Sequence, residues 1–405
     1  MNGRAEARHA GPGSLAGERD AWIVLASATG VGPETVAALL ARFGGARAVL
    51  DAATSGALRR WNAQRPLGGD MRWHRLPGAV LADLEAWPSA GVDRLHRLAE
   101  LGLWAVTPLD ADYPVGLRDL DPLPPLLIGC GERRNLLAPR PVALVGTRRP
   151  TANGRWLAGR AAARLVEAGA MVISGLALGI DGVAHAAALE RGGRTLGVIG
   201  GGHLHPGPRA HESLRRRIAE AGGTIISEYA PDVQPTKGTY PRRNRIIAAL
   251  AQAVLVIEAP ARSGALITAR DALELGRPVL VAPGRIGDWS VAGSLGLLRG
   301  TPARILAGLD EMLEDLGLLA AAEAPVDVAA APAPDQRRVD ALGMLDGAQR
   351  AVAERVCRSP ADLDTLVDDT GLAPAVVSSA VTLLLMRGWI QPVGPAYLPA
   401  GALLS

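Results

Sequence analysis

Six short apolar runs constrain the fold of this 405-residue chain more than any other feature. Each run has the length and the nearly continuous apolar character of a strand that is buried on both faces. Amphipathic segments of helical character lie between them, so the pattern predicts a doubly wound α/β fold with a mostly parallel sheet. The runs are Val142–Val145, Ala170–Ile173, Thr195–Ile199, Thr224–Ile226, Val254–Ile257 and Val279–Val281.

The segments that flank this region differ from it in composition. We expect residues 1–20 to form a disordered tail, because they are polar and rich in glycine. Helical patterns around a Gly-rich turn at Gly30–Pro33 predict a small helical domain over 21–110, followed by the sheet domain over 111–318. Residues 319–338 are rich in alanine and proline and are typical of a linker.

The last segment, 339–405, predicts a winged helix. A helix, a second helix from Ala361 and a third over Pro374–Met386 are followed by a short ribbon that ends at Tyr397. The third helix carries no charged residue. Because a DNA-reading helix needs cations for the phosphates, we expect this module to make a protein contact or to arrange a dimer, with a purely structural role as the alternative.

Composition excludes several classes of protein. Two cysteines, Cys130 and Cys357, do not make a disulfide framework or a zinc cluster. No apolar run reaches the ~18 residues of a membrane span, so we expect no membrane partner and a cytoplasmic location. The net charge is only +3, which means that a surface for polyanions has to arise from local clustering of arginine.

Glycines follow the predicted strands together with hydroxyl and arginine side chains, as a phosphate-binding edge requires. The carboxyl ends of parallel strands meet at one edge of a sheet, where ligands of such folds bind. We therefore interpret these turns as one binding groove. The candidate residues are Gly146, Thr147 and Arg148 after the first run, Ser174, Gly175 and Gly179 after the second, and Ser263, Gly264 and Thr268 after the fifth.

A basic helix start adds charge to this groove. Pro241 lies before an apolar helical run, and the free N–H groups of a first helical turn attract anions. Arginine supplies planar forks for phosphate oxygens. The candidate residues here are Arg242, Arg243, Asn244 and Arg245, with Lys237, the single lysine of the chain, just before them and Arg209 upstream.

The chain contains neither a GxGxxG fingerprint after the first run nor a GxxxxGK[ST] loop, which argues against a dinucleotide or P-loop nucleotide site. Single-stranded nucleic acid fits the remaining lining, and phosphate contacts should dominate because few aromatic residues lie nearby. Asp181 and His185 are spaced as on one helix face, but two ligands make a poor metal site. We expect Asp181 to cap the helix and His185 to be structural.

Taken together, these motifs resemble those of the DprA (Smf) family of DNA-processing proteins. The resemblance rests on six ordered motifs, and the flanking domains occur in the same order. The motifs are Gly146-Thr147-Arg148, Ser174–Ala177 with Gly179–Asp181 and Ala184-His185, Ser227–Tyr229, Pro241 with Arg243–Ile247, Glu258-Ala259 with Ser263-Gly264 and Leu266–Ala269, and Pro283-Gly284.

The resemblance implies an extended Rossmann-like domain between a helical, sterile-alpha-motif-like domain and a winged helix. It implies a non-catalytic recombination mediator without a cofactor, which binds and protects incoming single-stranded DNA, forms homodimers and helps to load the RecA recombinase in natural transformation (competence). By resemblance, the DNA contacts fall on Arg148, Arg243 and Arg245 and on the glycine turns. Lys237 and Arg242 are added from charge and proximity.

Four positions depart from the family pattern. Leu178 replaces an arginine, Gly207 and His211 replace a tyrosine and a downstream asparagine, and Leu295 replaces an asparagine. Arg209 is expected to substitute in part. These departures predict weaker DNA binding or altered base contacts.

Two other functions remain open. One is a Rossmann-like nucleotide or N-glycosidic hydrolase of the lysine-decarboxylase-like type, with Glu228 and Glu258 as acid or base. That group shows a Pro-Gly-Gly-x-Gly-Thr turn, whereas Pro283-Gly284 is followed here by Arg285. The other is a transcription regulator that binds an effector in the α/β domain, against which the uncharged helix of the winged module argues.

Overall fold

The structure is a computed structural model, which describes residues 17–64, 75–318, 342–393, 396–400 and 403. The linker expected over 319–338 lies outside the described residues, as does most of the tail expected over 1–20. The first helix already begins at Glu18.

A nine-stranded sheet forms the centre, in the order β1-β2-β6-β5-β4-β3-β7-β8-β9. All pairs among β3 to β9 are parallel, while the pairs β1–β2 and β2–β6 are antiparallel. The predicted mostly parallel, doubly wound fold is therefore confirmed. The strands are β1 (Trp104–Val106), β2 (Leu127–Gly131), β3 (Pro141–Val145), β4 (Met171–Ser174), β5 (Thr195–Val198), β6 (Thr224–Ser227), β7 (Ala253–Val256), β8 (Val279–Val281) and β9 (Arg304–Ile305).

Two apolar layers cover the sheet, because successive side chains of a strand point to opposite faces. Ala143 and Val145 of β3 face one layer, and Val142 and Leu144 face the other. Helices α10 (Thr239–Leu250), α11 (Ala265–Glu274) and α12 (Ala292–Gly300) cover the first face. Helices α7 (Ala152–Glu167), α8 (Ile180–Glu190) and α13 (Leu309–Asp315) cover the second, while α9 (Glu212–Glu220) packs in a neighbouring cluster.

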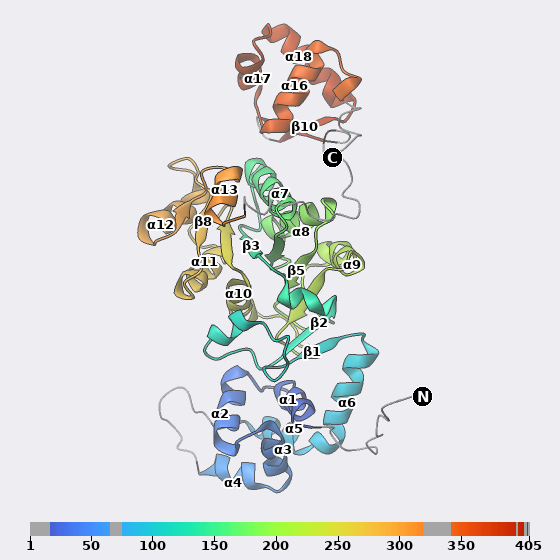
Figure 1. The fold of residues 1–405 in the computed structure, drawn as a ribbon, viewed down its shortest axis with the longest axis vertical. Helices are drawn as coiled ribbons and strands as arrows, with labels where there is room; N and C mark the ends of the chain where they lie inside the picture. Colours follow the sequence, from blue (N-terminus) through green and yellow to red (C-terminus); the bar gives the residue numbers. More distant parts are fainter. Residues whose placement is uncertain (1–16, 65–74, 319–341, 394–395, 401–402, 404–405) are drawn as a thin grey trace, which may run out of the picture.

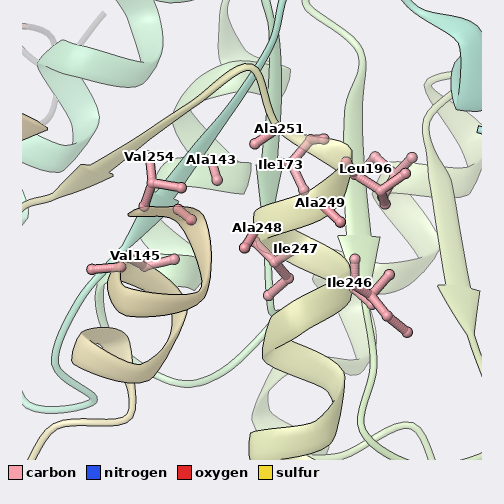
Figure 2. Close-up of a cluster of buried hydrophobic side chains, with 14 of the residues drawn as sticks. Ala143, Val145, Ile173, Leu196, Ile246, Ile247, Ala248, Ala249, Ala251 and Val254 are labelled. Carbon is pink, nitrogen blue, oxygen red and sulfur yellow. The ribbon is translucent and has the colours of Figure 1, made fainter. Parts of the chain in front are cut away.

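The apolar half of α10 anchors this helix on the sheet. Ile246 and Ile247 are almost completely buried and belong with Ile173 and Leu196 of the sheet to one apolar cluster, part of which Figure 2 shows. The first half of the helix carries the arginines of the predicted site. Their position is therefore set by the packing of the second half.

The N-terminal helices form a separate bundle beside the β1–β2 edge of the sheet (Figure 1). Arg19 is paired with Asp110 at 2.7 Å, and the indole Nε1 of Trp22 donates to the Pro125 carbonyl at 2.7 Å. These contacts fix the bundle to the sheet. The helices are α1 (Glu18–Ala26), α2 (Pro33–Phe43), α3 (Ala46–Thr54), α4 (Ala57–Ala63), α5 (Gly78–Glu85) and α6 (Trp87–Glu100).

The winged helix at the other end of the molecule (Figure 1) has its own core. It comprises α16 (Gly347–Arg358), α17 (Leu363–Thr370), α18 (Pro374–Met386) and the hairpin of β10 (Ile390–Val393) and β11 (Ala396–Pro399). The bounds of α18 are those predicted for the third helix. Within the described residues, no single helix has the length and apolar character to cross a membrane, and only α17 and α18 taken together across a 117° bend pass that test.

Candidate nucleic-acid interface

A small hollow lies at the carboxyl edge of the sheet, where β3, β4 and β5 end beside the start of α10. Its volume is about 60 Å³. We call it the arginine groove. It is lined by Arg148, Gly175, Leu176, Ala177, Leu178, Gly200, Pro206, Gly207, Pro208, Tyr240 and Arg243.

Arg148 forms the exposed rim of the arginine groove. Its guanidinium carbon lies 5.2 Å from the centre of the Tyr240 ring, a distance typical of a cation–π contact. None of the ion pairs found in the described part of the chain includes Arg148. Its charge is therefore available to an anion.

Arg243 forms the floor of the arginine groove and is only 5% exposed. The guanidinium donates to the carbonyls of Gly175 and Val198. Burial lowers the pKa of Arg243 to about 10, against the opposing effect of the nearby Asp181 carboxylate, so the side chain remains charged at neutral pH. Its Nε has no hydrogen-bond partner among the described residues.

Glycine at position 175 makes room for this arginine. A Cβ there would lie 2.4 Å from Nη1 of Arg243, which no real side chain tolerates. The resemblance assigns Gly175 to a DNA contact. In the structure its first role is to admit the buried guanidinium.

Asp181 organises the loop between β4 and α8. Its carboxylate accepts the backbone N–H groups of Gly175 and Ala177 at 3.1 and 3.3 Å, and both donors lie in the loop before the helix. The N-cap residue of α8 is Gly179, without a side-chain cap hydrogen bond, so Asp181 does not cap the helix as expected but orients the preceding loop. Burial raises the pKa of the Asp181 carboxyl, while the Arg243 charge and these N–H groups act in the opposite direction. His185 is fully buried and its Nδ1 contacts Thr195 Oγ1 at 2.8 Å, which supports the structural role expected for it.

Gly179 joins this loop to the loop that bears Arg148. It has φ 87°, and a Cβ there would lie 2.3 Å from the Thr147 carbonyl oxygen. Ile180 N–H donates to the same oxygen at 3.2 Å. The space beside Gly146 is similarly small, because a Cβ at this position would lie 2.5 Å from Cγ1 of Ile180. These two glycines therefore allow the two loops to approach closely.

Three further predicted cations lie exposed near the groove. Lys237 and Arg242 flank the first turn of α10, and Arg209 follows Pro208 at the groove wall. They add positive charge around the hollow without lining it. Ser263 and Gly264 lie at the start of α11, where the Ser263 hydroxyl accepts the Ala265 N–H at 3.3 Å.

Several predicted ligand residues instead point into the protein. Ser174 Oγ donates to the Leu144 carbonyl at 2.6 Å, and Thr268 is buried. Asn244 Nδ2 donates to the Gly264 carbonyl at 3.1 Å. The side chain of Thr147 is also buried, at 8% exposure, and its hydroxyl accepts the Arg149 N–H. None of these side chains lines the hollow.

Arg245 is also internal. Its guanidinium pairs with Glu228 and donates to the Pro122 carbonyl at 2.7 Å. The side chains of Arg245 and Glu228 are only 20% and 5% exposed. Of the three arginines of α10, Arg242, Arg243 and Arg245, the structure thus leaves the first exposed, the second on the groove floor and the third in an ion pair.

Comparison with known proteins identifies the family of the chain. A family model described as DNA recombination-mediator protein A matches residues 104–317, which is more than half of the chain. The protein belongs to this family. A model of the DprA winged helix domain matches residues 323–394.

Individual relatives cover much of the chain. A putative DNA processing protein DprA of Mycobacterium tuberculosis (strain CDC 1551 / Oshkosh) is 36% identical over 309 residues, which are 73% of this chain and 77% of that protein. DNA processing protein DprA of Bacillus subtilis is 36% identical over 222 residues, or 55% and 74% of the two chains. The X-ray structure of DNA processing protein A from Streptococcus pneumoniae has a TM-score of 0.51 and 30% identity, covering 70% of this chain and 98% of that one.

One feature separates this member of the DNA recombination-mediator protein A family from dinucleotide-binding folds. In those folds a pyrophosphate lies at the start of the helix after the first strand. Here the Glu258 carboxylate lies there, accepting from Thr151 N at 3.1 Å and from Thr151 Oγ1 at 2.6 Å. A Cβ at Gly154 would lie 2.3 Å from the same carboxylate. An internal acid therefore fills the usual phosphate position.

Sequence reasoning left Tyr240 out of the proposed site. Its position one residue before Pro241 places it in the first turn of α10, facing Arg148. The exposed Leu178 lines the groove where the family pattern has an arginine. Within the described ranges, no cluster of three His, Cys, Asp or Glu side chains is arranged to hold a metal ion.

Proposed function

We propose that this protein is a non-catalytic recombination mediator that binds single-stranded DNA at the arginine groove. The observation that carries the proposal is Arg148, an exposed cation without an ion-pair partner among the described residues, beside a glycine-lined hollow with a second guanidinium on its floor. Backbone phosphates fit this combination of fixed charge and close backbone approach. The membership of a family of DNA recombination mediators supports it.

The proposed contacts are the residues that are exposed at this edge of the sheet. Arg148, Lys237, Arg242 and Arg209 supply charge, Gly264 lies exposed at the start of α11, and Arg243 fixes the floor. The side chains that point inward serve as supports. Ser174, Thr268, Asn244 and Arg245 hold the loops that present the exposed groups.

The positions of both candidate catalytic carboxylates support a role without catalysis. Glu258 accepts three hydrogen bonds from Thr151, and Glu228 is paired with Arg245. A general acid or base needs to reach its substrate. Both carboxylates already have internal partners, which does not favour the hydrolase alternative.

We also propose the wider role that the resemblance implies, in which the protein acts as a homodimer and helps to load RecA in natural transformation. The expected domain division at residues 20, 110, 318 and 338 stays a proposal, with its first boundary moved before Glu18, where α1 begins, and its second before Trp104, where β1 begins. The uncharged α18 and the acidic residues on α17, Asp364, Asp368 and Asp369, support a protein contact for the winged helix. RecA filament formation on an oligonucleotide, measured with and without this protein, tests the loading role.

The groove itself is tested by equilibrium binding to one labelled oligonucleotide, as a single strand and as a duplex, across a salt series. We expect preference for the single strand and a linear fall of log affinity with log salt. Arg148→Ala should flatten the slope by about 0.7, the share of one phosphate on a single strand. Arg60→Ala, an exposed arginine of α4, is the matched control and should leave the slope unchanged. Equal affinity for both forms, or an unchanged slope in Arg148→Ala, contradicts the proposal.

A further inference from the structure

The turn after β8 carries the most exposed aromatic side chain of the described chain. Trp289 is 70% exposed, whereas every other aromatic residue within the described ranges is buried or half-buried. Ile286 in the same turn is 96% exposed. A monomer normally covers a side chain as large and apolar as tryptophan, so this position requires a reason.

The backbone around Trp289 is held firmly. Asp288 caps the turn by accepting the Ser290 N–H at 2.8 Å, and Ser290 itself is buried. Val291 fills the space beside Gly284, where a Cβ would lie 2.5 Å from it. Trp289 is thus held outward between two fixed neighbours.

The turn lies at the same edge of the sheet as the arginine groove. In the sheet order β3-β7-β8, the end of β8 lies two strand spacings, about 10 Å, from the end of β3. Ser294 of α12 and Ala259 after β7 exchange two hydrogen bonds, of 3.0 and 3.1 Å, which tie the β8 turn to the β7 turn. On the other side, the Thr147 N–H next to Arg148 donates to the Glu258 carbonyl at 2.7 Å, which ties the β3 turn to the β7 turn. Hydrogen bonds therefore connect the turn that carries Arg148 to the segment that follows Trp289.

Two exposed arginines line this part of the edge. Arg262 follows β7 and Arg285 follows β8, and none of the ion pairs in the described part of the chain includes either one. Hydrogen bonds from Thr365 and, to a smaller extent, the Arg285 charge lower the pKa of Asp362 in the winged helix, so Arg285 also acts on one acid outside the turn. The nearest acid in the turn, Asp288, is engaged with the Ser290 N–H, which with the Arg285 charge lowers its pKa. The surroundings of Trp289 are therefore suited to a polyanion with flat apolar groups.

We propose that Trp289 is a base-stacking platform, which with Arg262 and Arg285 extends the DNA path from the arginine groove across the β7 turn to β8. The inference rests on the proposed function, because it concerns a strand that is already bound at Arg148. Proteins that bind single strands without sequence preference combine a basic track with aromatic rings. In the groove, the Tyr240 ring already faces Arg148, so Trp289 supplies the free ring.

The test compares the full-length protein with Trp289→Ala and Trp289→Phe, using a long oligonucleotide and a short one that spans only the groove. Trp289→Ala should weaken binding of the long strand by about 5- to 150-fold, the loss expected for one stacked base. Trp289→Phe should retain most of the affinity, because it keeps a ring. The short strand should bind all three proteins equally.

The salt series separates stacking from charge. Trp289→Ala should leave the salt slope unchanged, since the indole neutralises no phosphate, whereas Arg285→Ala should flatten it by about 0.7. Intrinsic fluorescence should be quenched by the long strand in the wild type and less in Trp289→Phe. Trp389→Phe, which removes a half-buried tryptophan of the winged helix, is the control for the other indoles.

The outcomes distinguish the inference from the function on which it rests. If the wild type does not bind single strands, the proposed function fails as well. If the wild type binds and Arg148→Ala flattens the slope, but Trp289→Ala binds the long strand normally, only the stacking platform is wrong. A changed oligomeric mass of Trp289→Ala with unchanged DNA affinity assigns the turn to a protein contact and also overturns the inference.

Discussion

Replacing Arg245 by alanine should destabilise the folded protein but leave the contacts between the protein and DNA phosphates unchanged. The Arg245 guanidinium pairs with Glu228, whose side chain is 5% exposed, and also donates to the Pro122 carbonyl. Without the arginine, a buried carboxylate loses its only ion-pair partner in the described structure. Removing one partner of a buried pair costs about 3–5 kcal/mol, because the remaining charge stays desolvated.

Protonation of Glu228 should limit the loss of folding free energy in Arg245→Ala. Burial already raises the pKa of Glu228, and the Arg245 charge opposes that rise. In the variant the carboxyl group should take up a proton at higher pH. The destabilisation should therefore be largest at alkaline pH and smaller near pH 5, where the neutral acid is easier to form.

Differential scanning calorimetry of the full chain measures the effect on the sheet domain. A loss of about 3–5 kcal/mol corresponds to a fall in Tm of roughly 6–20 °C for a domain of this size. Arg242→Ala, the exposed neighbour on α10, is the matched control and should shift stability by less than about 0.5 kcal/mol. The double variant Arg245→Met with Glu228→Gln should recover part of the loss, since it leaves no buried charge.

The same variants decide which arginine contacts DNA. Arg245→Ala should keep the wild-type salt slope for single strands, and Arg242→Ala should flatten it if Arg242 contacts a phosphate. An Arg245→Ala protein of normal stability with a slope flattened by about 0.7 would refute the reasoning, because the guanidinium would then have to leave Glu228 for the ligand.

Two further perturbations test the framework below the groove. Gly179→Ala should lower the free energy of unfolding by well over 1 kcal/mol and weaken DNA binding, because position 179 has φ 87° and a Cβ there would lie only 2.3 Å from the Thr147 carbonyl oxygen. The control is Gly192→Ala, where φ is 69° and the space is open, so a denaturant titration should show only the backbone cost of about 1 kcal/mol. Burial, with the charges of His211 and Arg243, lowers the pKa of His185 to about 3. The folded state therefore favours the neutral imidazole of His185. Its contribution to the free energy of unfolding is fully present above pH 6.5 and is lost as the pH falls, by about 2 kcal/mol at pH 5. A His185→Gln variant whose stability falls as steeply between pH 7 and 5 contradicts this assignment.

The sheet could be predicted from the sequence because its parallel strands are buried on both faces. All six apolar runs appear as β3 to β8, with ends that differ by one residue or less. The three strands that were missed lack this signal. Both residues of β9 are exposed, and β1 and β2 are antiparallel strands at the other edge, with β1 inside the segment 21–110 that was expected to be helical.

The location of the groove could also be predicted, since the carboxyl edge follows from the parallel topology. The roles of the individual arginines could not. Arg243 precedes the buried Ile247 by one helical turn, which places it inward, as observed. The same rule also places Arg242 inward, one turn before the buried Ile246, yet Arg242 is exposed. The second half of α10 is buried all round, so the apolar period carries no information about which side its first turn exposes.

The partners of these arginines supply what the helical period lacks. Arg243 is drawn inward by Asp181 and by two carbonyls that only a glycine at 175 leaves accessible, and Arg245 is drawn inward by Glu228. These partners lie at the ends of β4, β5 and β6 and in the first turn of α8, and the folded sheet brings them together around α10. Arg148 has no such carboxylate in the described structure. A group of arginines at the carboxyl edge of a sheet therefore predicts a site for a polyanion. The arginines that are free to bind the ligand can be distinguished from those that support the fold only when the buried carboxylates around them have been located.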